Sequence, residues 1–287
     1  MTQIPGTDGQ FLAIHKFYSP DDSKEAKIVI ATPDGNGKWD IQTLVDIPFV
    51  HRFDVLKSHG KNYLIACTIK SGHAYKDDWS SPGKVYAARL PDDLSVYNDE
   101  HQLELQVIKE GMLKNHGYYK VQDEDSESSL VCSESGVYRF YPPQRQDEEW
   151  KIEQLLNTPA SDATLIDLDQ DGEKELVVLS PFHGSDIRIY KKSQMGYQLV
   201  YKYPEKAEFL HAIWSGTIKG KPTAIIGHRM GARRLMAFTW DIERQDYMFK
   251  TLDDNCGPAN AYGYSVAGKD VLIATNREID EIAMYIF

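Results

Sequence analysis

Short runs of alternating apolar and polar residues recur along the whole chain, and no helical i, i+3, i+4 pattern of useful length appears. The clearest unit begins near residue 160. Its four predicted strands are residues 163–167, 175–179, 186–191 and 197–203, and an Asp-Gln-Asp-Gly turn joins the first two. Runs of this length, bounded by Gly, Asp and Ser, are typical of antiparallel strands. The pattern therefore predicts an all-β chain.

The same four-strand unit repeats with a period of about 48 residues, as expected for one supersecondary unit per repeat. Matching segments start near residues 48, 113, 160, 209 and 258, and the first 45 residues carry three of the four strands. A lone four-stranded sheet cannot bury both faces, so each unit must cover its neighbour, which predicts a β-propeller. A β-sandwich of similar size would not explain the period.

We therefore predict a single propeller domain over residues 1–287, with six blades of four antiparallel strands. Five blades stay open as the alternative, because the first strand of the first unit and the last strand of the last unit are weak or absent. The predicted blades are residues 1–46, 47–110, 111–157, 158–206, 207–253 and 254–287.

Composition and charge indicate the class of protein, its cellular location and the partners it is expected to bind. Hydrophobic residues make up 41% and charged residues 26% of the chain, which indicates a globular protein with a large core. No apolar run is long enough to cross a bilayer, and no signal peptide is recognisable. The net charge of -11 repels phosphate backbones, so we do not expect nucleic acid as a partner. We expect no membrane partner either, whereas a protein partner stays open. Three widely spaced cysteines favour reduced thiols and a cytoplasmic location.

An acidic hairpin has the ligand pattern of a calcium-binding loop. Asp167, Asp169 and Asp171 alternate, and Gly172 and Glu175 follow. Alternate carboxylates converge on one side of a tight turn, as they do around Ca²⁺. The alternative is that these aspartates accept hydrogen bonds from turn amides and bind no ion. Followed by Leu-Val-Val, the pattern resembles the FG-GAP or VCBS repeat of β-propellers, which implies the same fold. The hairpin joins the first two strands of its blade, so its expected role is structural.

Histidines recur at one position of the repeat. The first strand of five successive units begins at His51, His116, Asp162, His211 and Asn260. Equal positions in the repeat become equal heights in a propeller, so we expect these side chains to face one another at one end of the channel. Imidazole and carboxylate groups in such a ring are the ligands that Zn²⁺, Mn²⁺ or Fe²⁺ takes. His51, His116, Asp162 and His211 are therefore the predicted metal ligands.

The loops between the second and third strands return to the same end of the molecule. They carry His73, His183 and His228, which we predict to form an outer ring and to act as proton carriers. The alternative for each histidine is capping of a strand end. The same end adds basic and aromatic residues, which suggest an anionic or polyhydroxylated small ligand. The predicted ligand-binding residues are Arg52, Tyr118, Trp214, Arg229 and Arg277.

The segment His211-Ala-Ile-Trp, followed by Gly227-His228-Arg-Met-Gly, resembles the propeller of aldos-2-ulose dehydratase-type proteins. That resemblance implies metal-assisted dehydration and isomerisation of keto-sugars. It places the histidine motif of that family at His116, His183, His211 and His228.

Three functions are compatible with the sequence. The first is a metal-dependent lyase or isomerase for a sugar, which needs a Lewis acid and a base of near-neutral pKa. The second is a non-catalytic carbohydrate-binding propeller, in which Trp214, Tyr118 and Tyr262 grip the sugar. The third is a scaffold that binds protein. No triad order, phosphate-binding loop or dinucleotide-binding glycine pattern supports a hydrolase, kinase or dehydrogenase.

Overall fold

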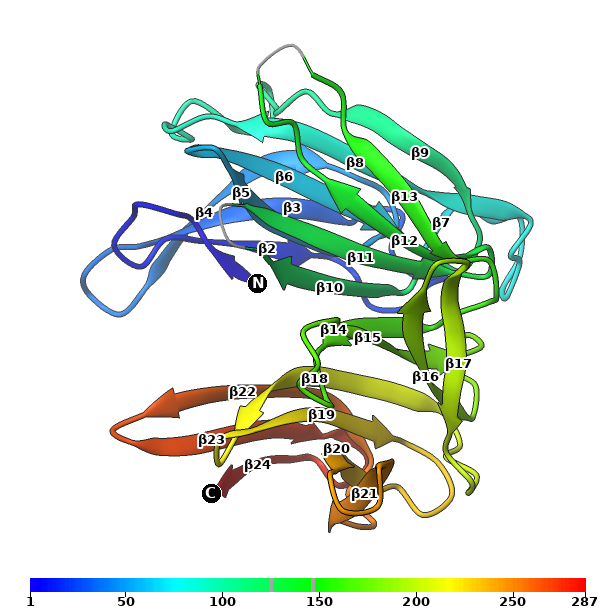
Figure 1. Cartoon of the computed structure of the whole chain (residues 1–287). Coiled ribbons are helices and arrows are strands. Elements are labelled where there is room, and N and C mark those ends of the chain that lie inside the picture. Colours follow the sequence, from blue (N-terminus) through cyan, green and yellow to red (C-terminus); the bar gives the residue numbers. More distant parts are fainter. Residues whose placement is uncertain (124–125, 146–147) are drawn as a thin grey trace. The chain divides into compact units, whose positions relative to one another are not determined.

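The computed structural model describes residues 1–123, 126–145 and 148–287 and consists of antiparallel sheets (Figure 1). The chain has the fold of an all-β six-bladed propeller, as the 48-residue period predicts. Among the described residues the only helical segment is the short 3-10 helix η1 (Arg277–Ile279). Within these residues no helix has the length and apolar character that a membrane span requires.

Residues Met1–Glu153 form the first of two compact units. Its sheets follow the order of the chain, except that a short extra strand, β7, pairs with β8 in the second sheet. The strands of this unit are β1 (Thr2–Gln3), β2 (Phe11–His15), β3 (Lys27–Pro33) and β4 (Trp39–Asp46) in the first sheet, β5 (Val50–Ser58), β6 (Lys61–Thr68), β7 (Lys70–Gly72), β8 (Ser81–Leu90) and β9 (Gln106–Met112) in the second, and β10 (Gly117–Gln122), β11 (Glu127–Ser133), β12 (Gly136–Tyr141) and β13 (Lys151–Leu156), which reaches into the next unit, in the third.

Residues Gln154–Phe287 form the second unit, also with three sheets. Its last sheet has three strands, and these are the three strands that the repeat predicts there. The strands are β14 (Asp162–Ile166), β15 (Glu175–Ser180), β16 (Asp186–Ser193) and β17 (Gly196–Lys202), then β18 (Leu210–Ile218), β19 (Lys221–His228), β20 (Leu235–Asp241) and β21 (Asp246–Asp253), then β22 (Pro258–Val266), β23 (Lys269–Asn276) and β24 (Glu281–Ile286).

Burial falls from the inner to the outer strands of a sheet. All six residues of β15 are buried, whereas β17, the fourth strand of the same sheet, is mostly exposed. Because every one of its residues is buried, β15 is covered on both faces. Such strands favour continuous apolar runs, which explains the Leu-Val-Val-Leu of β15.

The apolar cores lie between successive sheets of each unit. In the second unit, Val177, Leu179 and Ile187 of one sheet pack with Ile226 and Phe238 of the next. A further cluster joins the fifth and sixth sheets of the chain and includes Ile225, Leu235 and Leu272. The first unit contains two corresponding clusters. Each sheet therefore depends on its neighbour for burial.

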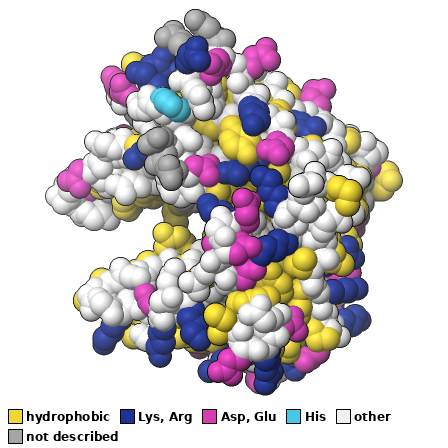
Figure 2. Space-filling model, viewed as in Figure 1, with side chains coloured by type: hydrophobic (Ala, Val, Ile, Leu, Met, Phe, Trp, Pro, Cys, Tyr) yellow, Lys and Arg dark blue, Asp and Glu magenta, His cyan; other side chains and the backbone are white. Residues whose placement is uncertain are grey.

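Charged side chains of both signs are interspersed on the surface. On the face drawn in Figure 2, Lys and Arg side chains lie among Asp and Glu side chains and do not gather in one region. Ion pairs such as Lys84–Glu110 (2.7 Å) and Arg188–Asp186 (2.5 Å) bring opposite charges together. The net charge of -11 is therefore not concentrated in a single visible patch.

Candidate functional site

The histidines that begin the predicted strands lie on β-bulges. In β5, Val50 pairs with Thr68 and Arg52 with Cys67, so His51 is the extra residue. In β18, His211 is the extra residue in the same way, between Leu210 and Ala212. A bulge leaves one residue outside the ladder and re-aims its side chain. The His51 and His211 side chains therefore do not follow the regular alternation of side chains between the two faces of the sheet.

Each bulge follows a phenylalanine in the left-handed backbone region. The φ angles of Phe49 and Phe209 are 65° and 59°. Their carbonyl oxygens accept equivalent hydrogen bonds, from the backbone N–H of Ile69 (3.0 Å) and of Arg229 (2.9 Å). The sequence signal for this arrangement is Phe-aliphatic-His, which occurs at residues 49–51 and 209–211. This motif is not among the predicted site features.

In the first unit, the rings of His51 and His116 lie against each other. Their centroids are 4.9 Å apart with an interplanar angle of 33°, and Phe17 packs on the His51 ring at 5.0 Å. Arg52 donates a hydrogen bond from Nε to the His116 carbonyl oxygen at 3.3 Å. The structure thus brings together two of the predicted metal ligands, with Arg52 beside them.

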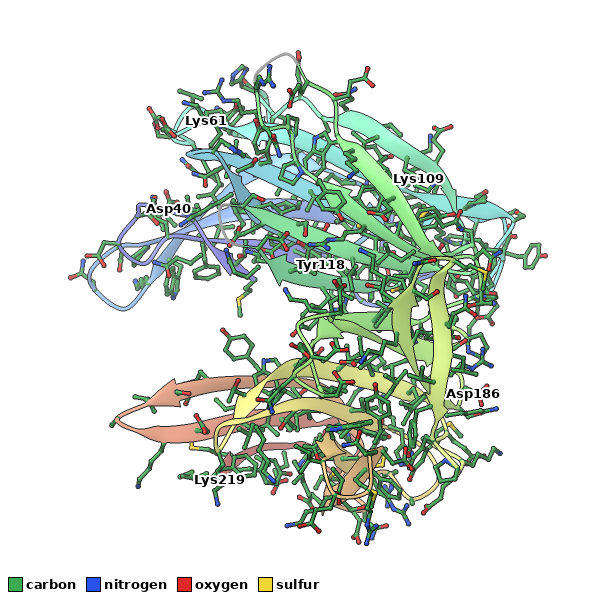
Figure 3. The ribbon with its side chains drawn as sticks, viewed as in Figure 1. Asp40, Lys61, Lys109, Tyr118, Asp186 and Lys219 are labelled. Carbon is green, nitrogen blue, oxygen red and sulfur yellow. The ribbon has the colours of Figure 1, made fainter. Side chains whose placement is uncertain are left out.

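Two other predicted residues of the first unit are turned inward. Tyr118 lies on β10 (Figure 3), and its hydroxyl oxygen is buried; burial raises the pKa of this group well above its ordinary value. The ring of His73 packs edge-on against Phe49 at 5.7 Å, and its Nδ1 is buried without a hydrogen-bond partner among the described residues. Neither the Tyr118 hydroxyl nor the His73 Nδ1 is open to solvent.

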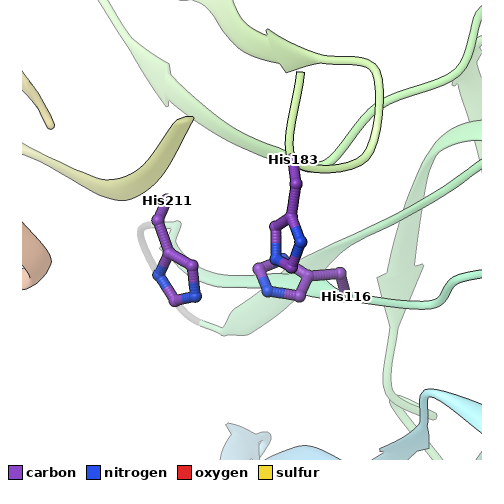
Figure 4. Close-up of side chains that lie close together, drawn as sticks. All are labelled: His116, His183 and His211. Carbon is purple, nitrogen blue, oxygen red and sulfur yellow. The ribbon is translucent and has the colours of Figure 1, made fainter. Parts of the chain in front are cut away.

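In the second unit, His183 and His211 form a stacked pair. Their ring centroids are 5.5 Å apart with an interplanar angle of 22°, and a ring nitrogen of each lies within 4.8 Å of the other. His183 is held between Phe182 at 4.0 Å and Phe209 at 4.3 Å. Figure 4 draws the His183 and His211 side chains.

The tautomer of His211 follows from its hydrogen bond. Its Nδ1 lies 2.7 Å from the carbonyl oxygen of Ala259, which can only accept a hydrogen. Nδ1 is therefore the protonated nitrogen in the neutral ring, and Nε2 carries the lone pair. Ala259 is the bulged residue of β22, so the neighbouring sheet orients this imidazole.

Asp162 begins β14 close to the loop that bears His183. It is buried, and its Oδ1 accepts a hydrogen bond from the Ala163 N–H at 3.0 Å. The adjacent Ser161 Oγ accepts a hydrogen bond from the His183 backbone N–H at 3.3 Å. The start of β14 therefore fixes the backbone of the His183 loop.

His228 uses both ring nitrogens within its own loop. Nδ1 lies 2.8 Å from the Met230 carbonyl oxygen, and Nε2 accepts a hydrogen bond from the Arg234 N–H at 3.2 Å. The residue is buried, and burial lowers the pKa of the ring below its ordinary value. This geometry describes a neutral imidazole that closes a loop.

Of the predicted ligand-binding residues in the second unit, Arg229 and Trp214 make contacts within the protein and Arg277 does not lie buried. Arg229 donates from Nε and Nη2 to one oxygen of Glu278, at 2.9 and 2.6 Å, and its guanidinium lies over the Phe209 ring at 4.8 Å. Arg277 is exposed. The Trp214 indole lies against Gly216 and Gly263, where an added Cβ would come within 2.5 and 2.4 Å of the ring.

The acidic hairpin lies at the opposite end of its sheet from the His183 loop. Asp162 pairs with Leu179 at one end of β14, and Ile166 pairs with Glu175 at the other. The hairpin and the histidine pair are therefore separate features of one sheet, as the sequence predicts.

The aspartates of this hairpin accept hydrogen bonds from its backbone amides. Asp167 accepts from the N–H groups of Asp171 (3.1 Å) and Gly172 (3.0 Å), and Asp171 accepts from Glu173 (2.9 Å). A ligand oxygen from each of Asp167, Asp169 and Glu175 lies within 4.8 Å of the others. The turn thus combines hydrogen-bonded aspartates with a converging set of carboxylates.

Comparisons with solved structures bear out the fold. A candidate 6-phosphogluconolactonase from Bacteroides uniformis matches with a TM-score of 0.59 at 14% identity, over 99% of this chain and 80% of its own. The leech intramolecular trans-sialidase complexed with 2,7-anhydro-Neu5Ac matches with a TM-score of 0.53 at 9% identity, over 97% of this chain and 66% of its own. These likenesses are to the propeller fold.

The chain spans half the length of Trypanosoma rangeli sialidase, of which it covers 50%; that match has a TM-score of 0.49 at 12% identity over 95% of this chain. No protein-family model matches the chain, and no curated protein matches its sequence. The resemblance to FG-GAP or VCBS repeats therefore stays a prediction.

Proposed function

We propose that this chain is a metal-dependent lyase or isomerase acting on a sugar or another small polyhydroxylated compound, with His183 and His211 as its metal-binding pair. The observation that carries the proposal is the hydrogen bond from His211 Nδ1 to the Ala259 carbonyl oxygen. Metal-binding histidines almost always donate their other N–H to a carbonyl or carboxylate, which fixes the tautomer and the ring orientation.

The residues of the second unit fit a divalent transition metal. A ring nitrogen of His183 lies within 4.8 Å of one of His211. Zn–N bonds are about 2.0–2.1 Å long, so a small side-chain rotation would let both imidazoles bind one ion. Imidazole suits Zn, Mn or Fe. Asp162, buried at the start of β14, is the carboxylate that the sequence predicts as a further ligand.

When bound, such an ion would stabilise the negative charge that develops on a substrate oxygen during elimination. The chain itself binds the ion and orients the ligands. Phe182 and Phe209 stack on the His183 ring and orient it. His228 has no part in this proposal, because both of its nitrogens close the loop.

The ligand class is proposed from two observations. Arg277 is exposed on η1, whose Glu278 holds Arg229, so one cationic side chain near this end is open to an anionic group. The structural neighbours with TM-scores above 0.5 are named for reactions of sugar derivatives, a 6-phosphogluconolactone and a sialic acid. Both favour an acidic or polyhydroxylated sugar.

Metal content tests the proposal. We expect purified protein to contain a stoichiometric transition metal, and His211→Ala to lower its affinity at least 10-fold, which is the low end of the loss seen even for outer partners of metal ligands. The matched control is His15→Ala, because His15 is exposed at the end of β2. Equal metal affinity in wild type and His211→Ala contradicts the proposal. The same measurement on His116→Ala asks whether the His51–His116 pair binds metal.

The second candidate function is non-catalytic carbohydrate binding. Tyr262 and Tyr264 are 66% and 37% exposed, and their rings are stacked with centroids 6.4 Å apart. Exposed aromatic rings with a polar tip are suited to packing against a sugar. A metal-free protein whose sugar affinity is unchanged in His211→Ala and lost in Tyr262→Ala would favour this function.

A further inference from the structure

A lysine of the same blade is inserted into the acidic hairpin. Lys191 lies on β16, and its Nζ is 2.5 Å from Asp171 Oδ2 and 3.6 Å from Glu175 Oε1. It also donates a hydrogen bond to Asp169. Two of the three carboxylates that converge within 4.8 Å, those of Asp169 and Glu175, therefore already face a positive charge.

We propose that Lys191 takes the place of a calcium ion in this hairpin, so that the fourth sheet of the chain folds without a bound metal. The hairpin then keeps the ligand pattern of a calcium loop, while a side chain supplies the cation. This inference is independent of the histidine pair at the other end of the sheet.

The buried carboxylate of Glu175 shows why a cation is needed there. Glu175 is fully buried; its Oε2 accepts a hydrogen bond from the Leu168 N–H at 2.7 Å, and its Oε1 accepts one from the Tyr247 hydroxyl at 3.1 Å. Burial raises the pKa of Glu175. A buried carboxylate is strongly destabilising when its charge has no partner. Lys191 provides a positive charge without an ion from solution.

The protonated state of Lys191 is secured by its surroundings. Burial acts to lower the pKa of Lys191, but hydrogen bonds to Asp169 and Asp171 outweigh burial and raise it above the ordinary value. The hydrogen bond to Lys191 in turn lowers the pKa of Asp171. The Lys191 ammonium and the Asp171 carboxylate thus each favour the charged state of the other.

Without Lys191, the hairpin would hold three acidic side chains whose oxygens lie within 4.8 Å of one another, with Asp171 in the same turn. Ca²⁺ binds such oxygen sets, and its affinity rises with the number of carboxylates. Asp167 remains oriented by the turn amides, so the geometry does not depend on Lys191 alone. Removing the ammonium is therefore expected to open a calcium site in the existing turn.

The test compares wild type with Lys191→Ala by thermal unfolding in EDTA, in 5 mM CaCl₂ and in 5 mM MgCl₂ (about these concentrations, chosen to exceed weak Ca²⁺ sites). We expect the wild-type Tm to be the same in all three. Lys191→Ala should lose about 5 °C or more in EDTA, as expected for an unpaired buried carboxylate in a chain of this size. CaCl₂ should restore most of that loss, because a ligand that binds only the folded state stabilises it.

Matched variants separate this role from a general loss of charge. Lys192→Ala removes the neighbouring exposed lysine of β16 and should leave the Tm unchanged in every buffer. Lys191→Arg keeps the charge and should not respond to calcium. Lys191→Ala combined with Asp171→Asn should show a weaker calcium response. If Lys191→Ala fails to fold in EDTA, refolding in CaCl₂ replaces the melting comparison.

A wild-type Tm that rises in CaCl₂ or falls in EDTA overturns the proposal, because the native hairpin would then bind calcium. A destabilised Lys191→Ala that gains nothing from CaCl₂ also overturns it, since Lys191 would then be an ordinary ion-pair partner.

Discussion

Equal positions in the repeat do not give histidines equal roles. His183 and His228 occupy corresponding loops, and the sequence predicts one outer ring from them. In the structure His183 lies stacked beside His211, whereas His228 is buried with both nitrogens engaged by its own loop. His228 differs because its ring nitrogens bind two nearby backbone groups, the Met230 carbonyl and the Arg234 N–H. The identity of the residue at this position of the repeat does not predict these hydrogen bonds.

The buried His228 should make stability depend on pH. Burial lowers the pKa of its ring below the ordinary 6.5, so the unfolded chain takes up this proton more readily. The stabilisation is complete above about pH 6.5 and is lost as the pH falls towards the folded pKa. At pH 7.5 (an assay pH about one unit above that value), we expect His228→Ala to unfold with about 1–3 kcal/mol less free energy, because two hydrogen bonds are lost.

Chemical denaturation across pH checks this expectation. The difference in unfolding free energy between wild type and His228→Ala should shrink as the pH falls below 6.5, because protonation penalises only the wild type. The control is His15→Ala, which removes an exposed histidine at the end of β2. A His228 difference that is constant or grows on acidification would contradict the assignment.

At the scale of strands, the sequence assigns Trp214 to ligand binding, and the structure gives it a packing role as well. Its indole fills the space above two glycines, Gly216 on its own strand β18 and Gly263 on β22. A glycine in a strand often marks the close approach of another group. In the sequence, these two strand glycines are therefore the feature that indicates where the Trp214 ring packs.

Adding a methyl group under the indole should destabilise the fold. In Gly263→Ala the new Cβ would lie 2.4 Å from the Trp214 ring, and overpacking of this kind costs about 1–3 kcal/mol. Gly72→Ala is the control, since its Cβ would meet only Ser81 at 3.8 Å. The cost of Gly263→Ala should be smaller in a Trp214→Ala background, as a double-mutant cycle measures. Additive effects would mean that the ring and the glycine do not interact.

At the scale of the whole molecule, the period of the sequence predicts the fold correctly. The first sheet shows why: apolar alternation predicts β2, β3 and β4, while β1 has only two residues. The site is less predictable, because bulges at His51 and His211 and the stack of Phe182 and Phe209 on His183 depend on contacts between sheets. Lys191 was missed for the same reason, since it reaches the hairpin from another strand.

Dependence of each sheet on its neighbour leads to a final prediction. Ile225 and Leu235 of the fifth sheet are fully buried in a cluster completed by Leu272 and Ala274 of the sixth. A chain ending at Asp253 would expose this surface, and sheets that are each covered by a neighbour lose stability when that neighbour is removed.

We therefore expect the truncated chain either to aggregate or to bind a hydrophobic dye such as ANS and unfold at a lower temperature than the full chain. The full chain should neither bind the dye nor aggregate. The control is Ile282→Thr in the full chain, because Ile282 is 77% exposed on β24 and contributes little burial. A truncated chain that is monomeric and as thermostable as the full chain would show that the fifth sheet does not need this cover, contrary to the packing described above.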